Sequence, residues 1–158
     1  MKKLFVVIAL AILSFSANAQ AYIGGAMNFQ TAGNNAVVTL RPEIGYAMSQ
    51  KTAIGAVIGW SNAGAANTFL IAPYYRYGVK NFGPVSFFVD GELQIQARTA
   101  GGASTTTFGV GLCPGIAIQA SDNWAFVGRI AQIGYYGGTF GINANMSNNW
   151  HIGLYYHF

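Results

Sequence analysis

The sequence predicts an all-β fold, an eight-stranded antiparallel up-and-down transmembrane β-barrel, and three observations predict it. The 158 residues are 53% hydrophobic but only 8% charged, against roughly a quarter in an average soluble domain. Beyond the N-terminal segment, no apolar run is long enough to form a membrane-spanning helix. Eight segments instead alternate apolar and polar side chains, which is the pattern of a strand with one face in lipid and one in a lumen.

The N-terminal segment has the features of a secretory signal. Lys2 and Lys3 precede the short apolar run Leu4–Leu13, and Ala17 and Ala19 fit an A-x-A cleavage site. We therefore predict a cleaved signal peptide over residues 1–19 and a barrel domain over residues 20–158. Because the chain has a single cysteine, no intrachain disulfide can stabilise the exported domain.

The eight segments are rich in β-branched and aromatic residues, which favour strands over helices. Gly, Asn and Ser gather between them, as expected at turns. In chain order, the predicted strands are Ala21–Phe29, Val37–Met48, Thr52–Trp60, Thr68–Val79, Val85–Arg98, Thr106–Ile118, Trp124–Tyr135 and Phe140–Phe158.

Two of these strands need comment. In the seventh, Gln132 falls on the same parity as Trp124 and Phe126 and interrupts the apolar face. The eighth keeps one alternation over its whole length, so we predict a single long strand, with a break at residues 147–149 as the alternative. The short connections 49–51, 80–84 and 119–123 predict periplasmic turns, and residues 31–36, 61–67, 97–105 and 136–139 predict extracellular loops.

Three prolines lie inside predicted strands, although proline lacks the N–H that a sheet needs. Pro42, Pro73 and Pro114 each stand seven residues before the next turn. We predict three bulges or kinks on the outer face; the alternative is that these strands begin at their prolines.

Seven charged residues lie on the parity opposite the bulky apolar side chains. The small Gly, Ala and Ser residues that share this parity suit a crowded interior, so we assign it to the lumen. Unpaired buried charges are costly, and the interior of an eight-stranded barrel is just filled by side chains. We interpret the set as a salt-bridge plug, with a narrow ion path as the alternative. It comprises Arg41, Glu43, Arg76, Asp90, Glu92, Arg98 and Arg129.

Aromatic residues near the strand ends predict two belts at the membrane surfaces. Tyr46, Tyr77 and Trp124 fall at the periplasmic ends, and Trp60 and Trp150 fall near the opposite ends. Tyr136 is predicted to join the second belt.

The remaining polar residues suggest no catalysis, metal or cofactor. Asp90 and Glu92 share a face but point into a filled lumen without access for a substrate. His151 and His157 are six residues apart, roughly 20 Å along a strand, which is too far to share a metal. No His-x-Ser sequence suggests a lipid hydrolase, and the few basic residues do not cluster as in a nucleic-acid binder.

Several short motifs resemble the outer-membrane β-barrel domain family, which includes small OmpX-like and porin-like barrels of eight strands. They are the A-x-A-Q signal end, LRPEIGY (40–46), APYYRY (72–77), CPGI (113–116) and GLYYHF (153–158). The resemblance implies an integral protein of the bacterial outer membrane, a monomer whose partner is the lipid bilayer. From the plugged lumen we predict a structural or surface-interacting role, with a narrow porin-like channel for ions or small solutes as the alternative. The resemblance also implies that the outer-membrane assembly machinery recognises Ile152, Leu154, Tyr156 and Phe158.

Overall fold

The computed structural model describes residues 21–32, 35–143 and 151–158 of the chain. All regular structure in these residues is β-strand, and no helix among them is long and apolar enough to cross a membrane. The strands are β1 (Ala21–Ala32), β2 (Asn35–Ala47), β3 (Thr52–Ala63), β4 (Ala66–Phe82), β5 (Val85–Ala100), β6 (Ala103–Gln119), β7 (Trp124–Arg129), β8 (Gln132–Tyr136), β9 (Thr139–Asn143) and β10 (His151–His157).

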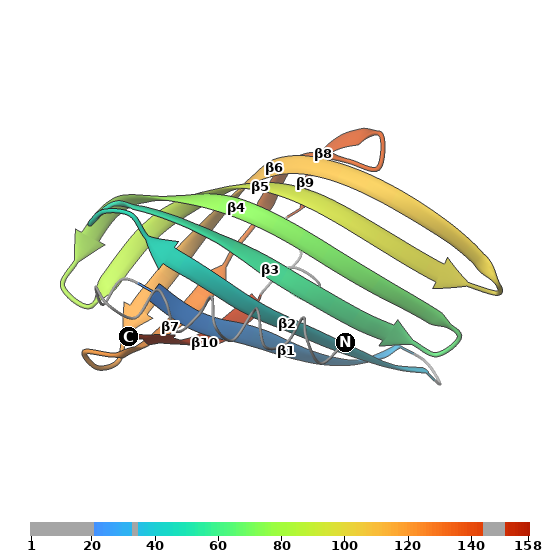
Figure 1. The fold of residues 1–158 in the computed structure, drawn as a ribbon, viewed down its shortest axis with the longest axis horizontal. Helices are drawn as coiled ribbons and strands as arrows, with labels where there is room; N and C mark the ends of the chain where they lie inside the picture. The colour runs from blue at the N-terminus through green and yellow to red at the C-terminus, as the bar shows by residue number, and fades with distance from the viewer. Residues whose placement is uncertain (1–20, 33–34, 144–150) are drawn as a thin grey trace, which may run out of the picture.

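These strands form a closed antiparallel barrel (Figure 1). Consecutive strands pair from β1 to β6, and β10 pairs with both β1 and β7. The strand β6 pairs with β5 on one side and with both β7 and β8 on the other. The strands β7 and β8 are successive pieces of one strand of the wall, and so are β9 and β10. The barrel therefore has eight strands. The predicted fold class is confirmed.

Most of the large apolar side chains lie on the outer wall, and the paired charged side chains lie on the inner wall. In β4, Ile71 and Tyr75 are 42% and 49% exposed, whereas their neighbours Ala72 and Tyr74 are 1% and 5% exposed. The same alternation runs through β3 and the lower half of β5. A soluble barrel would bury the large apolar side chains instead, so this distribution is that of a barrel surrounded by hydrocarbon.

The strands run further than their composition predicts. Gly101 and Gly102 have φ of 58° and 82°, and Gly137 and Gly138 have φ of 59° and 88°. Positive φ at both central residues closes a two-residue hairpin. The predicted loops 61–67 and 97–105 are therefore wrong, because most of their residues belong to strands that meet at tight turns, whereas 136–139 is a tight turn with one strand residue on each side.

As a result, the hairpin of β5 and β6 is longer than a membrane span. The 17 residues of β6 extend roughly 55 Å, or about 40 Å along the axis of a tilted barrel, against an apolar band about 25 Å tall. This hairpin and that of β3 and β4 extend at the end of the barrel opposite the C-terminus (Figure 1).

The predicted bulges at the three prolines are wrong. Leu40 pairs with Trp60 and Glu43 with Val57, so the register is the same on both sides of Pro42. Pro73 keeps its register with β3, and Pro114 keeps its register with β5. Each proline omits a hydrogen bond without adding a residue, and omission alone does not shift the register.

A bulge lies instead between β7 and β8, on the strand beside Pro114. Arg129 pairs with Gly115, whereas Ile133 pairs with Leu112, so three residues oppose two of β6. The Ile130 N–H donates to the carbonyl oxygen of Pro114 at 2.9 Å.

The bulge inverts the parity of every residue that follows it on the strand. Gln132 and Tyr136 therefore face the lumen, where both donate to Glu92. This explains why Gln132 interrupted the apolar pattern, and it corrects the prediction that Tyr136 belongs to an outer aromatic belt.

The last strand is not continuous in register, so the prediction of one uninterrupted strand is wrong. His151 pairs with Arg129, and Asn143 pairs with Gln132. Only two residues lie between Arg129 and Gln132, whereas seven lie between Asn143 and His151, so the register changes between β9 and β10. The predicted alternative break at 147–149, like Trp150, lies outside the described residues.

Candidate functional site in the lumen

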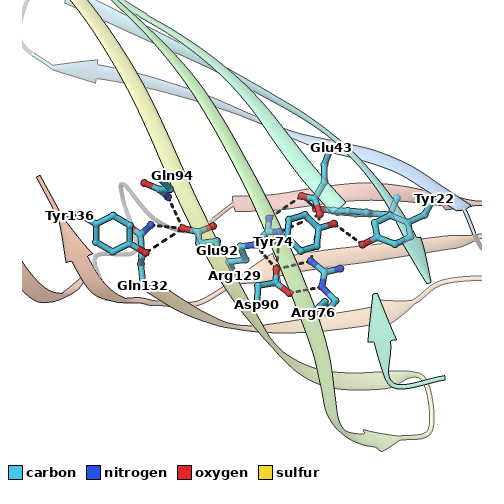
Figure 2. Close-up of polar contacts among 11 residues, drawn as sticks. Tyr22, Glu43, Tyr74, Arg76, Asp90, Glu92, Gln94, Arg129, Gln132 and Tyr136 are labelled. Atoms are coloured by element: carbon cyan, nitrogen blue, oxygen red, sulfur yellow. Dashed lines mark hydrogen bonds and ion pairs between the residues drawn. The ribbon is translucent and has the colours of Figure 1, made fainter. Parts of the chain in front are cut away.

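Four charged side chains from four strands meet across the lumen (Figure 2). Asp90 on β5 accepts from Arg76 Nε at 2.7 Å and from Arg129 Nε at 2.9 Å. Glu43 on β2 accepts from Arg129 Nη1 at 2.9 Å and lies 3.5 Å from Arg76 Nη2. We call these four residues the ion-pair layer. Because the two carboxylates are 0% and 2% exposed and each meets both guanidinium groups, the layer is neutral and internally paired.

Aromatic side chains surround the ion-pair layer. The Tyr155 hydroxyl donates to Glu43 at 2.6 Å, and the hydroxyls of Tyr22 and Tyr74 are 2.6 Å apart. The Arg76 guanidinium lies 4.0 Å from the centre of the Phe88 ring. The guanidinium groups are therefore flanked by rings as well as carboxylates, an arrangement that stabilises a desolvated cation.

Glycines on neighbouring strands make room for these rings. A side chain at Gly45 would collide with the Tyr22 ring, and one at Gly115 would collide with Phe88. The lumen is therefore filled by large rings placed over glycines. Small residues were expected to fill the lumen, and the inward rings of Tyr22 and Tyr155 were not predicted. Phe88 shares the parity of Asp90 and Glu92 on β5, which was the available signal for its ring.

A second polar cluster lies beside the ion-pair layer, toward the hairpin end (Figure 2). Glu92 on β5 accepts from the Gln94 amide at 2.6 Å, from the Gln132 amide at 2.7 Å and from the Tyr136 hydroxyl at 3.4 Å. We call these four residues the Glu92 cluster. Glu92 is 5% exposed, and neutral donors satisfy it.

Of the seven predicted lumen charges, four form ion pairs with one another in the part of the chain that the structure describes. Glu92 has the neutral partners above. Arg41 on β2 lies among the lumen residues without an ion pair there, and its Nε is buried without a hydrogen-bond partner. Arg98 lies higher on β5 and is exposed. The seven charges predicted to form one plug are therefore divided among an ion-pair layer of two arginines and two carboxylates, Glu92 with its neutral donors, Arg41, and Arg98.

Three cavities follow the lumen from the ion-pair layer to the hairpin end. A lower cavity of about 180 Å³ is lined by Glu43, Arg129 and the Glu92 carboxylate. An upper cavity of about 150 Å³ shares Arg41 with it, and a mouth cavity of about 450 Å³ reaches Arg98.

A further hollow belongs to the outer wall. An apolar groove of about 700 Å³ crosses β1 to β5, with Ile23, Ile44 and Tyr75 among its lining residues. None of the seven predicted lumen charges lines it.

Apart from Tyr136, the aromatic residues predicted for the belts lie on the outer wall where the structure describes them. Trp60, Tyr77 and Trp124 are 42%, 49% and 43% exposed, and Tyr46 is partly buried. Trp150 lies outside the described residues.

The C-terminal residues join the wall at the end opposite the long hairpins. The rings of Trp124 and Tyr156 are 5.0 Å apart, and those of Tyr156 and Phe158 are 5.1 Å apart. The Phe158 N–H donates to the Ala21 carbonyl oxygen at 3.0 Å. Leu154 faces outward at 46% exposure, whereas the side chain of Ile152 lies outside the described part.

Comparison with known proteins gives a likeness in structure alone. No protein-family model matches the sequence, and no curated protein matches it. The structure is similar to the crystal structure of Neisserial surface protein A, with a TM-score of 0.59 and 16% identity over 88% of this chain and 95% of that one. It is also similar to the outer membrane protein Ail of Yersinia pestis in a phospholipid bilayer nanodisc. There the TM-score is 0.57 and the identity 10%, over 89% of this chain and 100% of Ail.

Proposed function

We propose that this chain, which has the fold of the small outer-membrane β-barrels, is an integral protein of the bacterial outer membrane with a closed lumen. Its role is structural or surface-interacting. The ion-pair layer carries this proposal, because Asp90, with 0% exposure, is held between Arg76 and Arg129 in the middle of the lumen.

The outer wall supports the membrane location. Large apolar side chains such as Ile71, Leu93 and Phe126 are each more than 40% exposed, and hydrocarbon is the solvent that accepts such a surface. After cell fractionation, the protein is expected in the outer-membrane fraction with electrophoretic mobility that changes on heating. Recovery in the periplasmic supernatant would contradict the location.

Closure of the lumen is tested by conductance in planar lipid bilayers. The wild-type barrel is expected to show no steady conductance, because an ion on the axis would have to displace paired groups that are already desolvated. The double variant Arg76→Ala/Asp90→Ala removes one pair and is expected to open a path. Arg98→Ala, at the mouth, is the control and should show no steady conductance.

The competing function is a narrow channel, and the three polar cavities above the layer are the observation in its favour. A steady wild-type conductance that Arg76→Ala or Glu92→Ala abolishes would establish the channel and overturn the closed lumen.

Export and assembly are part of the proposal. Residues 1–19 are removed, so mass spectrometry of the purified protein should give Gln20 as the first residue.

The assembly machinery recognises the C-terminal pattern of Ile152, Leu154, Tyr156 and Phe158. Phe158→Ala should lower the amount in the outer membrane, whereas Phe140→Ala, which alters another exposed phenylalanine, should not; equal amounts for both would contradict the recognition.

The barrel acts as a monomer and without enzymatic activity. The Asp90 and Glu92 carboxylates are hydrogen-bonded to other side chains inside the lumen. They are therefore not free to act on a substrate. Purified protein should leave phospholipid and lipid A intact, and turnover of either would contradict this part of the proposal.

A further inference from the structure

The lumen above the ion-pair layer is a blind polar vestibule. The upper and lower cavities share Arg41, Gln94 and Gln96 among their lining residues, and the mouth cavity shares Gln96 with the upper one. These shared residues make the three cavities neighbours in one series that begins at the long hairpin of β5 and β6.

The upper cavity differs from the lower one in its charge. Glu92 lines the lower cavity but not the upper one, where Arg41 is the one charged side chain among the lining residues. The other polar groups there are neutral hydroxyls and amides, all of which can donate hydrogen bonds. They are Thr39, Ser61, Thr68, Gln94 and Gln96.

Among the described residues, no carboxylate lies within ion-pair distance of Arg41, and Glu92 acts on it only at longer range. Glu43 and Asp90 are bonded to Arg76 and Arg129. Glu92 is held by two amides and a tyrosine hydroxyl. Among the described residues, Arg41 therefore has no ion pair, and its buried Nε has no hydrogen-bond partner. A desolvated guanidinium in this state favours an anion from solution.

We propose that the upper cavity binds a small oxyanion from solution, of the class of inorganic phosphate or a small carboxylate, on the guanidinium of Arg41. Arginine presents a planar fork of N–H donors that matches two oxygens of such an ion. The hydroxyl and amide walls bind the remaining oxygens. A cavity of about 150 Å³ has room for a small ion.

The test is calorimetric titration of the full mature barrel, refolded in uncharged maltoside micelles, with inorganic phosphate. Saturable binding is expected. Arg41→Gln should weaken it by at least about tenfold, since a charge-assisted pair is lost. Arg98→Gln makes the same change in charge at the mouth and should leave the affinity within about twofold. Absence of saturable binding, or equal weakening by both variants, would overturn the proposal.

A measurement on the wild-type chain covers the case in which Arg41→Gln does not fold. In ¹⁵N-labelled protein, phosphate should shift the Arg41 Nε–H resonance with the saturation seen in calorimetry. Arg129 serves as the internal control, since its Nε is already bonded to Asp90 at 2.9 Å and its resonance should not move. Binding without a shift at Arg41 would contradict the assignment of the site.

Discussion

Asp90 is a carboxylate enclosed in the lumen between two guanidinium groups. It is 0% exposed, and its two oxygens accept from Arg76 and Arg129 at 2.7 to 2.9 Å. Such a group stabilises little on its own, because pairing largely offsets desolvation. Its removal is costly, however, since it leaves buried positive charge without compensation.

Asp90→Ala is therefore expected to lower the free energy of unfolding by about 3–5 kcal/mol. The measurement is urea unfolding of the barrel in phospholipid vesicles, followed by tryptophan fluorescence. Asp122→Ala, the same substitution at an exposed turn residue, should change it by less than about 0.5 kcal/mol. Equal effects for the two variants would show that the ion-pair layer does not support the barrel.

At the residue scale, the sequence predicted which face of the wall carries the charged side chains, but not which aromatic rings point into the lumen. The parity rule separates Asp90 and Arg76 from the apolar face because a charge in lipid is costly. The same rule assumes that bulky side chains face outward, and Tyr22 and Tyr155 do not: they are buried in the lumen. Which carboxylate each arginine meets depends on strands that are distant in sequence, so the unpaired state of Arg41 could not be predicted.

At the scale of the strand, the bulge between β7 and β8 determines which side chains surround Glu92. One inserted residue turns Gln132 and Tyr136 from the outer wall to Glu92. Tyr136 fits there because its ring lies against Gly109 and Gly111 of β6. The bulge and the glycines of the neighbouring strand therefore depend on each other.

Gly109→Ala tests this dependence. The added methyl group would collide with the Tyr136 ring, so the free energy of unfolding should fall by about 1–3 kcal/mol. The matched control is Gly141→Ala on β9, where a Cβ would have no atom within 4 Å. Adding Tyr136→Ala to the first variant should recover part of the loss, and a purely additive double variant would contradict the packing.

The elements were predictable where a local period defines them, and not where a partner does. Alternation at period two identifies β4 and β5 and their faces from the sequence alone. A bulge is visible only against the neighbouring strand, so Gln132 looked like an exception. The paired glycines at 101–102 did carry a hairpin signal, but their Thr-rich and Ala-rich surroundings favoured a longer loop.

At the scale of the whole molecule, the barrel reverses the arrangement of a soluble protein. Its ionised groups are enclosed and its large apolar groups cover the outside, as Ile71 and Ala72 illustrate at 42% and 1% exposure. The proposed membrane location, the closed lumen and the oxyanion site all require this orientation of the wall.

The most direct test of that orientation is the accessibility of nitroxide spin labels along β4 in phospholipid vesicles. Labels are placed singly at positions 69 to 75 in a Cys113→Ala background. Collisions with oxygen, which concentrates in hydrocarbon, should be frequent at 69, 71, 73 and 75 and rare at 70, 72 and 74. Loss of this alternation, or its inversion with the even positions open to oxygen, would contradict the account.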